Sequence, residues 1–295
     1  RHSDMAFLHY RDAAFLIQRK KQFGGLTPLY DMALSFAASA DDPISGGRHK
    51  VLGCANTFVP PQTSTIASHL PKAVGAAHSL GMAQRLKLAD AVLPHDAIIL
   101  CSFGDASANH STSQGAFNAA CWAAYQHLPM PIIFLCEDNG IGISVRTPGG
   151  WIEANFAHRP ALHYIQCDGA DLNDALRGCQ EAVHYARSRR KPVFLHMRTV
   201  RLMGHAGADV EASYSALAHI ETAEAQDPLL HSARIVHEQA GLSGEEIVRR
   251  YQDMRARVDH VAQDALAKPR IETASDVMAS IDPVEGLKTS PSLPD

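Results

Sequence analysis

The sequence predicts an α/β fold with a mainly parallel, doubly wound sheet flanked by helices and followed by C-terminal helices. Four apolar segments have the length of buried strands: 97–103, 131–136, 163–166 and 192–197. Helical spacing is found between them at 113–127 and 171–190. A strand, a helix and a second strand of one sheet form a right-handed parallel unit in nearly every case, so this alternation favours a parallel sheet.

Further helices are expected on both sides of this alternation. Their expected ranges are 5–23, 28–40, 71–88, 226–240 and 244–267. Pro71 suits the first turn of its helix, Asp171 is the expected cap of the helix over 171–190, and Ser243 with Glu246 forms a capping box. The segment 199–222 has no clear periodicity, and a connection of that length indicates a functional loop.

Composition and charge exclude several classes of protein. The chain is 46% hydrophobic and 20% charged, which is ordinary for a soluble globular protein. Its net charge of −4 gives no reason to expect nucleic acid or an anionic membrane as a partner. No apolar run is long enough to span a bilayer. The six cysteines are scattered, without metal-ligand spacing, and are expected to be reduced.

The 295 residues are expected to form one large domain over 1–270, with a linker or disordered tail over 271–295. The first residue is Arg1, and no signal-peptide pattern follows it. The sequence is therefore expected to be an excerpt from which an N-terminal part is missing.

Two of the expected strands end in oxygen-bearing side chains. One runs into Gly104-Asp105, and the next ends in Asp138-Asn139-Gly140. The carboxyl ends of neighbouring parallel strands meet at one edge of a sheet, where α/β proteins bind ligands. A carboxylate and an amide oxygen suit Mg²⁺ that holds a phosphorylated cofactor. The alternative is a common strand-to-helix turn capped by an aspartate.

Two basic segments are candidate anion sites. The loop from Arg198 to Gly207 follows a strand directly and contains Arg201 and His205, which suit an anion and an acid/base group. Tyr10-Arg11-Asp12 offers a forked cation for phosphate oxygens. The alternatives are a polar surface loop for the first and an ordinary helix surface for the second. The segment 60–71 could close over a ring system or could be a capped helix entry.

Taken in order, these segments resemble the alpha subunit of the thiamine-diphosphate-dependent decarboxylating component of 2-oxo acid dehydrogenase complexes. The resemblance extends from Tyr10 to the helices near 266. It rests on Tyr-Arg, the loop before a small-residue helix, Gly-Asp, Asn-Gly and Arg-x-x-Gly-His. The amino-acid sequences of these motifs resemble those of a bacterial branch of the family in which alpha and beta portions are fused. A bacterial, cytoplasmic location is therefore expected.

The resemblance implies a thiamine-diphosphate-binding fold and a role for each motif. Asp105 and Asn139 would ligate Mg²⁺ through side chains, and Ile141 through its carbonyl. The diphosphate would be held by the backbone of Gly104, Ala106 and Ser107 and by Tyr10, Arg11 and Arg201. Ser64 and Ile66 would contact the aminopyrimidine, and His205 would lie near the reactive carbon as the catalytic residue.

The resemblance also implies partners and a reaction. The reaction would be oxidative decarboxylation of a 2-oxo acid, branched-chain or pyruvate, with acyl transfer to the lipoyl group of an acyltransferase component. A beta subunit or beta-like domain would supply the activating Glu, in an alpha2–beta2-type assembly. The alternatives are another thiamine-diphosphate enzyme, transketolase-like or acetoin-cleaving, and a non-catalytic assembly subunit of the same fold.

Two of the chain's departures from the family pattern concern the turn around Asp105. Asp105 and Asn139 are 34 positions apart, a longer interval than usual, with the excess expected to loop out around 110–113. Ala106 stands where the usual turn has a second glycine.

Overall fold

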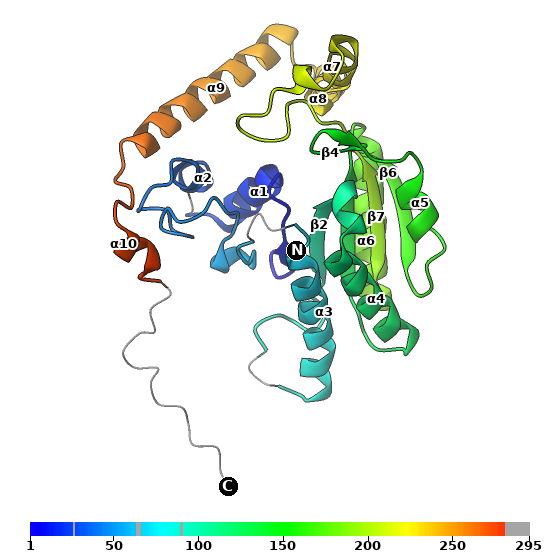
Figure 1. The fold of residues 1–295 in the computed structure, drawn as a ribbon. Helices are drawn as coiled ribbons and strands as arrows, with labels where there is room; N and C mark the ends of the chain where they lie inside the picture. The colour runs from blue at the N-terminus through cyan, green and yellow to red at the C-terminus, as the bar shows by residue number, and fades with distance from the viewer. Residues whose placement is uncertain (26, 63–65, 89–90, 281–295) are drawn as a thin grey trace.

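A computed structural model describes residues 1–25, 27–62, 66–88 and 91–280. Five parallel strands form its central sheet in the order β1-β2-β3-β7-β6 (Figure 1). Their bounds are Met5–Phe7 (β1), Ile99–Gly104 (β2), Ile132–Asp138 (β3), Val193–Arg198 (β7) and His163–Asp168 (β6). The prediction of a mainly parallel α/β sheet flanked by helices is confirmed.

Helices cover both faces of the sheet, as expected for a doubly wound arrangement. One face packs on α3 (His69–Arg85), α4 (Ser111–Tyr125) and α5 (Trp151–Phe156), and the other on α1 (Ala13–Phe23) and α6 (Leu172–Arg189). Five fully buried aromatic rings fill the first face: Phe103, Phe117, Phe134, Phe156 and Phe194. Phe117 contacts all four of the others, at ring-centroid distances between 4.9 and 5.9 Å and in edge-on or tilted orientations, an arrangement that aromatic pairs favour.

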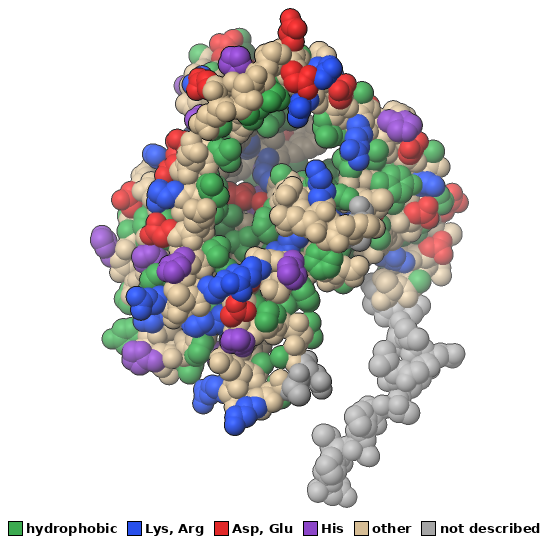
Figure 2. Space-filling view, turned by 180° about the vertical axis from the view of Figure 1, so that it is seen from behind, with side chains coloured by type: hydrophobic (Ala, Val, Ile, Leu, Met, Phe, Trp, Pro, Cys, Tyr) green, Lys and Arg blue, Asp and Glu red, His purple; other side chains and the backbone are tan. Residues whose placement is uncertain are grey.

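The C-terminal helices form a bridge across the molecule. Their bounds are Leu217–Glu224 (α7), Pro228–Ala240 (α8), Gly244–Leu266 (α9) and Ala274–Met278 (α10). The C-terminal part of α9 packs against α2 (Pro28–Phe36) around Leu34, Ala37 and Ala265 (Figure 1). Figure 2 shows a hollow toward the top of that view, with Lys and Arg side chains around it.

Several predicted helix ends are confirmed by their caps. The Asp171 side chain accepts hydrogen bonds from the backbone amides of Asn173 and Asp174 at the start of α6. The Ser243 hydroxyl accepts one from the Glu246 amide at the start of α9. These side chains satisfy amides that have no partner within the helix.

The first predicted helix was wrong over its N-terminal part. Residues 5–7 form strand β1, which pairs with β2 from Met5↔Ile99 to Phe7↔Cys101, and the helix begins only at Ala13. Pairing with a buried neighbouring strand overrides the weak helical spacing of so short a segment. Residues 110–113 also differ from expectation. They were expected to loop out between the two strands, but they form the cap and the first turn of helix α4.

Several small elements lie outside the predicted strands and helices. They are the 3-10 turns η1 (Ala55–Thr57), η2 (Asp105–Asn109) and η3 (Glu211–Ser213), and the two-residue strands β4 (Ile141–Gly142) and β5 (Val145–Arg146). Helix α10 falls within the segment expected to be a linker, where Arg48 donates to the carbonyls of Asp276 and Val277. No helix among the described residues is long and apolar enough to cross a membrane.

Candidate functional site

Four segments that are far apart in the sequence meet at the carboxyl edge of the sheet. They are the turn after β1, the turn η2 after β2, the residues from Asn139 to β5 after β3, and the loop 199–215 after β7. Since all these strands are parallel, their carboxyl ends open on the same edge. This edge is where the sequence predicts the site.

The Gly104-Asp105 turn buries its carboxylate. Asp105 is 2% exposed, and its Oδ2 accepts a hydrogen bond of 2.5 Å from the Thr147 hydroxyl. Burial raises the pKa of Asp105, and the charge of nearby Asp138 raises it further. Two carboxylates held side by side form a place where a cation would be stabilised.

The Asn139-Gly140 turn folds back onto η2. The Asn139 side-chain oxygen accepts from the Ile141 amide at 3.1 Å, and the Gly140 carbonyl accepts from the Thr147 amide at 3.0 Å. A Cβ atom placed on Gly142 would come within 2.7 Å of the Cβ of Ala106, so only glycine fits there. The structure thus brings the two predicted motifs into direct contact.

The loop after β7 is held by a buried arginine. Arg201 is 8% exposed, and its guanidinium donates to the Ile143 carbonyl at 2.6 Å and to the Tyr214 hydroxyl at 2.7 Å. Its Nε–H is buried without a hydrogen-bond partner. Arg201 therefore joins the loop to the Asn139 turn and keeps one donor that a bound anion could use.

His205 lies next to Tyr10 and Arg11. The Arg11 guanidinium donates to the His205 carbonyl at 2.7 Å, and the Tyr10 ring meets the His205 ring edge-on with centroids 6.1 Å apart. Partial burial and the charges of Arg11 and Arg201 lower the pKa of His205. Tyr10 and Arg11 sit in a turn before α1, so the alternative of a helix surface is wrong for them.

Asp209 and Tyr214 belong to the same loop and were missed by sequence reasoning. The Asp209 carboxylate accepts from the His205 amide and, at 2.6 Å, from the Tyr214 hydroxyl. A Cβ atom on Gly204 would lie 2.7 Å from the Asp209 carbonyl oxygen, so the turn needs glycine. No local pattern in the sequence marks Asp209 as a functional residue. The available signal was its position as the first carboxylate after His205.

A second group that sequence reasoning missed is a cluster of the buried residues His9 and Ser102 with the half-buried carboxylates of Asp12 and Glu137. The Asp12 carboxylate accepts from the Ser102 hydroxyl and, at 2.8 Å, from the His9 amide. Burial lowers the pKa of His9 to about 3, helped by Arg11. Burial and nearby Asp12 raise the pKa of Glu137 well above its usual value. Asp12, directly after Tyr10-Arg11, was the available signal.

The other predicted residues have different surroundings. Ser64 lies outside the described residues. Ile66 is exposed in the turn before α3, whose first residue His69 bonds the Ser102 carbonyl at 2.7 Å. Gly104 ends β2, and Ala106 and Ser107 follow in η2, where the Ser107 carbonyl accepts from the Ser113 hydroxyl at 2.6 Å.

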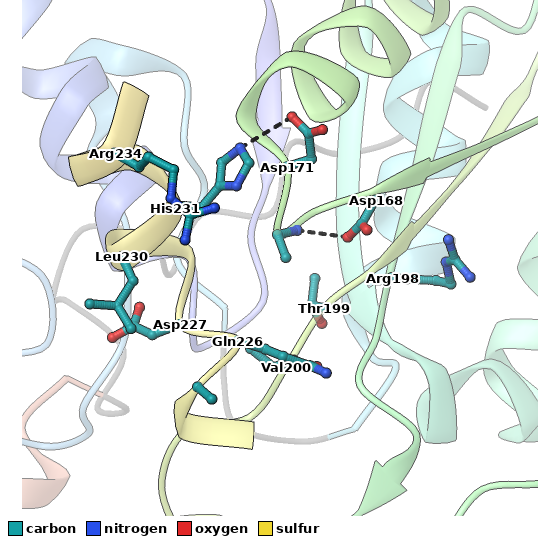
Figure 3. A pocket seen from close by; sticks show the side chains of 12 residues that line it. Asp168, Asp171, Arg198, Thr199, Val200, Gln226, Asp227, Leu230, His231 and Arg234 are labelled. Atoms are coloured by element: carbon teal, nitrogen blue, oxygen red, sulfur yellow. Dashed lines mark hydrogen bonds and ion pairs between the residues drawn. The ribbon is translucent and has the colours of Figure 1, made fainter. Parts of the chain in front are cut away.

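Two neighbouring cavities open beside these turns. One of about 280 Å³ is lined by Asn139, Ile141 and Arg201 among others. The other, of about 620 Å³, lies between the ends of β6 and β7 and helix α8 (Figure 3). In Figure 3 His231 of α8 points to Asp171, with His231 Nε2 3.4 Å from Asp171 Oδ1. Thr199 and Val200 line both cavities.

The residues at this edge fit a magnesium-bound diphosphate in their chemistry. The fit rests on the paired carboxylates of Asp105 and Asp138 for a cation and on the unpartnered Nε–H of Arg201 for an anion. Across the described ranges, no group of three or more His, Cys, Asp or Glu side chains is arranged to hold a metal. A metal here would therefore need amide and carbonyl oxygens, such as those of Asn139 and Ile141.

The sequence matches the family model of the dehydrogenase E1 component over residues 1–274. This chain belongs to that family. Among curated relatives, the family member is 27% identical over 229 residues to the mitochondrial 2-oxoisovalerate dehydrogenase subunit alpha of Mus musculus. It is 28% identical over 275 residues to 2-oxoisovalerate dehydrogenase subunit alpha of Bacillus subtilis (strain 168), and 30% identical over 229 residues to subunit alpha 2 of Arabidopsis thaliana.

The extent of these matches differs between relatives. They cover 76%, 91% and 74% of this chain for the mouse, Bacillus and Arabidopsis proteins, and 47%, 77% and 43% of those proteins. The chain thus spans about half the length of the mitochondrial relatives that it matches.

Proposed function

We propose that this chain is the alpha part of a thiamine-diphosphate-dependent 2-oxo acid dehydrogenase, active together with a beta partner. The observation that carries the proposal is the meeting of Tyr10-Arg11, the Asp105 turn, the Asn139 turn and the Arg201–His205 loop at one sheet edge. The relatives' names contain 2-oxoisovalerate, which favours a branched-chain 2-oxo acid as substrate, ahead of pyruvate.

In this proposal the two turns hold the diphosphate end of the cofactor within a thiamine-diphosphate-binding fold. Asp105 and Asn139 would bind Mg²⁺ through side chains and Ile141 through its carbonyl. The diphosphate would be held by Gly104, Ala106, Ser107, Tyr10, Arg11 and Arg201. Ser64 and Ile66 would contact the aminopyrimidine. The burial and raised pKa of Asp105 support the metal role, because a cation would relieve the cost of its charge.

His205 is the proposed catalytic residue. The chemistry that thiamine diphosphate supplies when bound is addition of its ring carbon to a 2-oxo group and storage of the electron pair left by CO₂. The lowered pKa keeps the His205 imidazole neutral near neutral pH, so it can hydrogen-bond the substrate oxygen. Arg11 fixes the His205 backbone, and Asp209 fixes its amide.

The remaining parts of the machinery would come from partners. A beta subunit or beta-like domain would supply the Glu that activates the aminopyrimidine, in an alpha2–beta2-type assembly. A lipoyl-bearing acyltransferase would take the acyl group. We assign the role to residues 1–270 of a cytoplasmic bacterial protein, with 271–295 as a linker or tail that includes helix α10.

The decisive assay combines the chain with a matching beta portion and a panel of 2-oxo acids, with an artificial electron acceptor. Oxidative decarboxylation with a preference for branched-chain acids is expected. Carbon–carbon transfer or acetoin cleavage would instead indicate another thiamine-diphosphate enzyme. Asp105→Ala should abolish binding of thiamine diphosphate with Mg²⁺ in calorimetry, and unchanged affinity would refute the metal role.

A further inference from the structure

A diagonal row of three polar side chains crosses the sheet below the Asn139 turn. Tyr164 lies on β6, His196 on β7 and Asp138 at the end of β3. In the strand register Tyr164 is opposite Phe194, and His196 is opposite Cys136. Each member is therefore two residues closer to the carboxyl edge than the last, so all three share one face.

Hydrogen bonds join this row from end to end. The Tyr164 hydroxyl is 2.6 Å from His196 Nδ1, and His196 Nε2 is 2.8 Å from Asp138 Oδ2. A carboxylate only accepts, so Nε2 carries the hydrogen toward Asp138, and in the neutral ring Nδ1 accepts the Tyr164 hydroxyl hydrogen. His196 is 4% exposed, and both of its ring nitrogens are used.

Asp138 connects this row of hydrogen bonds to the Asn139 turn. Its second oxygen, Oδ1, accepts from the Gly140 amide at 3.0 Å, and its carbonyl accepts from the Thr199 amide at 2.7 Å. One side chain thus bonds β7 through one oxygen and the backbone directly after Asn139 through the other. The orientation of Asn139 and Ile141 depends on where Asp138 is held.

We infer that Tyr164 and His196 are positioning residues that hold the Asp138 carboxylate and, through it, the Asn139–Ile141 turn of the cofactor site. The inference rests on the proposed function for what the turn binds, but not for the hydrogen bonds that hold it. Outer partners of this kind commonly change metal affinity by about 10–100-fold when they are removed.

The first test needs no cofactor. Hydrogen exchange at the Gly140 amide reports its bond to Asp138 Oδ1 directly, in the full 295-residue chain. His196→Leu, which removes the donor to Asp138, should reduce protection of that amide at least about tenfold. His196→Gln keeps an N–H near the position of Nε2 and should retain most of the protection.

Two further variants guard against a general loss of stability. Tyr164→Phe removes one hydroxyl and should reduce Gly140 protection by a smaller factor, in case His196→Leu fails to fold. His163→Leu, on β6 and stacked on Tyr185, is the matched control and should leave Gly140 protection unchanged. Unchanged protection in both His196→Leu and Tyr164→Phe would overturn the inference.

The second test measures the binding of thiamine diphosphate with Mg²⁺ by calorimetry, in the chain assembled with its beta portion. His196→Leu should weaken binding at least about tenfold, and His196→Gln should restore most of it. Equal affinity of wild type and His196→Leu contradicts the positioning role. If wild type binds no cofactor, the proposed function fails, while Gly140 exchange still decides whether the row positions the turn.

Discussion

Close contact between two small residues decides how the predicted motifs fit together. Gly142 faces Ala106 so closely that an added Cβ would lie 2.7 Å from the Cβ of Ala106. The Gly-Asp turn has Ala106 where the family pattern has a second glycine. Gly142, on the opposite side of the contact, has no side chain and so leaves room for the Cβ of Ala106. A single sequence reveals the Ala106 departure but not the residue that accommodates it.

This contact predicts a rescue by a second substitution. Gly142→Ala should lower the free energy of unfolding by about 1–3 kcal/mol, because two Cβ atoms would overlap. Ala106→Gly combined with Gly142→Ala should recover most of that loss in urea unfolding. Gly149→Ala, with nothing within 4 Å of the added Cβ, is the control. Additive effects of the two substitutions would show that the side chains do not meet.

His205 offers a prediction about pH. Because partial burial, Arg11 and Arg201 lower its pKa, the imidazole should gain its proton at a lower pH than an ordinary histidine. Arg11→Gln removes one of the repelling charges, so the pKa should rise. An NMR titration of the His205 ring, assigned with His205→Gln, measures both. Arg249→Gln on exposed α9 should leave the midpoint in place, and an equal rise there would point to a global charge effect.

At the scale of elements, an ion pair joins helix α6 to the N-terminal edge of the sheet. The Arg187 guanidinium donates to both oxygens of Asp4, at 3.1 and 2.7 Å, and to the Asp96 carbonyl at 2.6 Å. Asp4 is 6% exposed and also accepts from the Ile98 amide at 3.0 Å. Burial acts to raise the pKa of Asp4, but these hydrogen bonds lower it overall.

Arg187→Ala should therefore lower the free energy of unfolding by about 2 kcal/mol, because the buried carboxylate loses its guanidinium and keeps only the Arg1 ammonium and the Ile98 amide. Arg177→Ala is the matched control on the same helix, since its pairs with Asp174 and Glu181 are exposed and should contribute little. The wild-type advantage should shrink as the pH falls through the lowered pKa of Asp4, where the carboxylate becomes protonated. Thermal unfolding from pH 7 to pH 3 measures the difference in stability between wild type and Arg187→Ala. A difference that stays constant over this pH range would show that the ion pair is unimportant.

The elements that sequence reasoning found are those whose signal is local. Helix α6 has its own cap in Asp171, and β2 and β3 are apolar runs that need no partner to be recognised. Strand β1 has only three residues and is set by its pairing with β2, which no local pattern records. The two-residue strands β4 and β5 likewise exist only because the Asn139 turn folds back, as the bond from the Thr147 amide to the Gly140 carbonyl illustrates.

At the scale of the whole molecule, the order of the motifs predicted the family, and the parallel sheet explains why they meet. The row from Tyr164 to Asp138 and the bond from Arg11 to His205 depend on strand register and loop path. Neither set of contacts can be predicted from the spacing of residues along the chain.

The assembled protein should differ sharply from this chain alone. Without a beta portion we expect no decarboxylation of any 2-oxo acid, because the activating Glu is assigned to the partner. Adding the beta portion should restore activity in the artificial-acceptor assay. Full activity of the isolated chain would contradict the shared site, and a beta portion carrying Ala in place of that Glu is the matched negative control.

The contact between α2 and the end of α9 also has a consequence for how the molecule is made. Ser39 donates through its hydroxyl to the Pro269 carbonyl, and the Ala40 amide donates to the same oxygen, across a separation of 230 residues for Ser39. Translation proceeds from the N-terminus at about 5–20 residues per second, so α2 must wait roughly 10–50 seconds for its partner to be synthesised. During that interval Leu34 and Ala37 lack the apolar cover that Ala265 gives them in the folded chain.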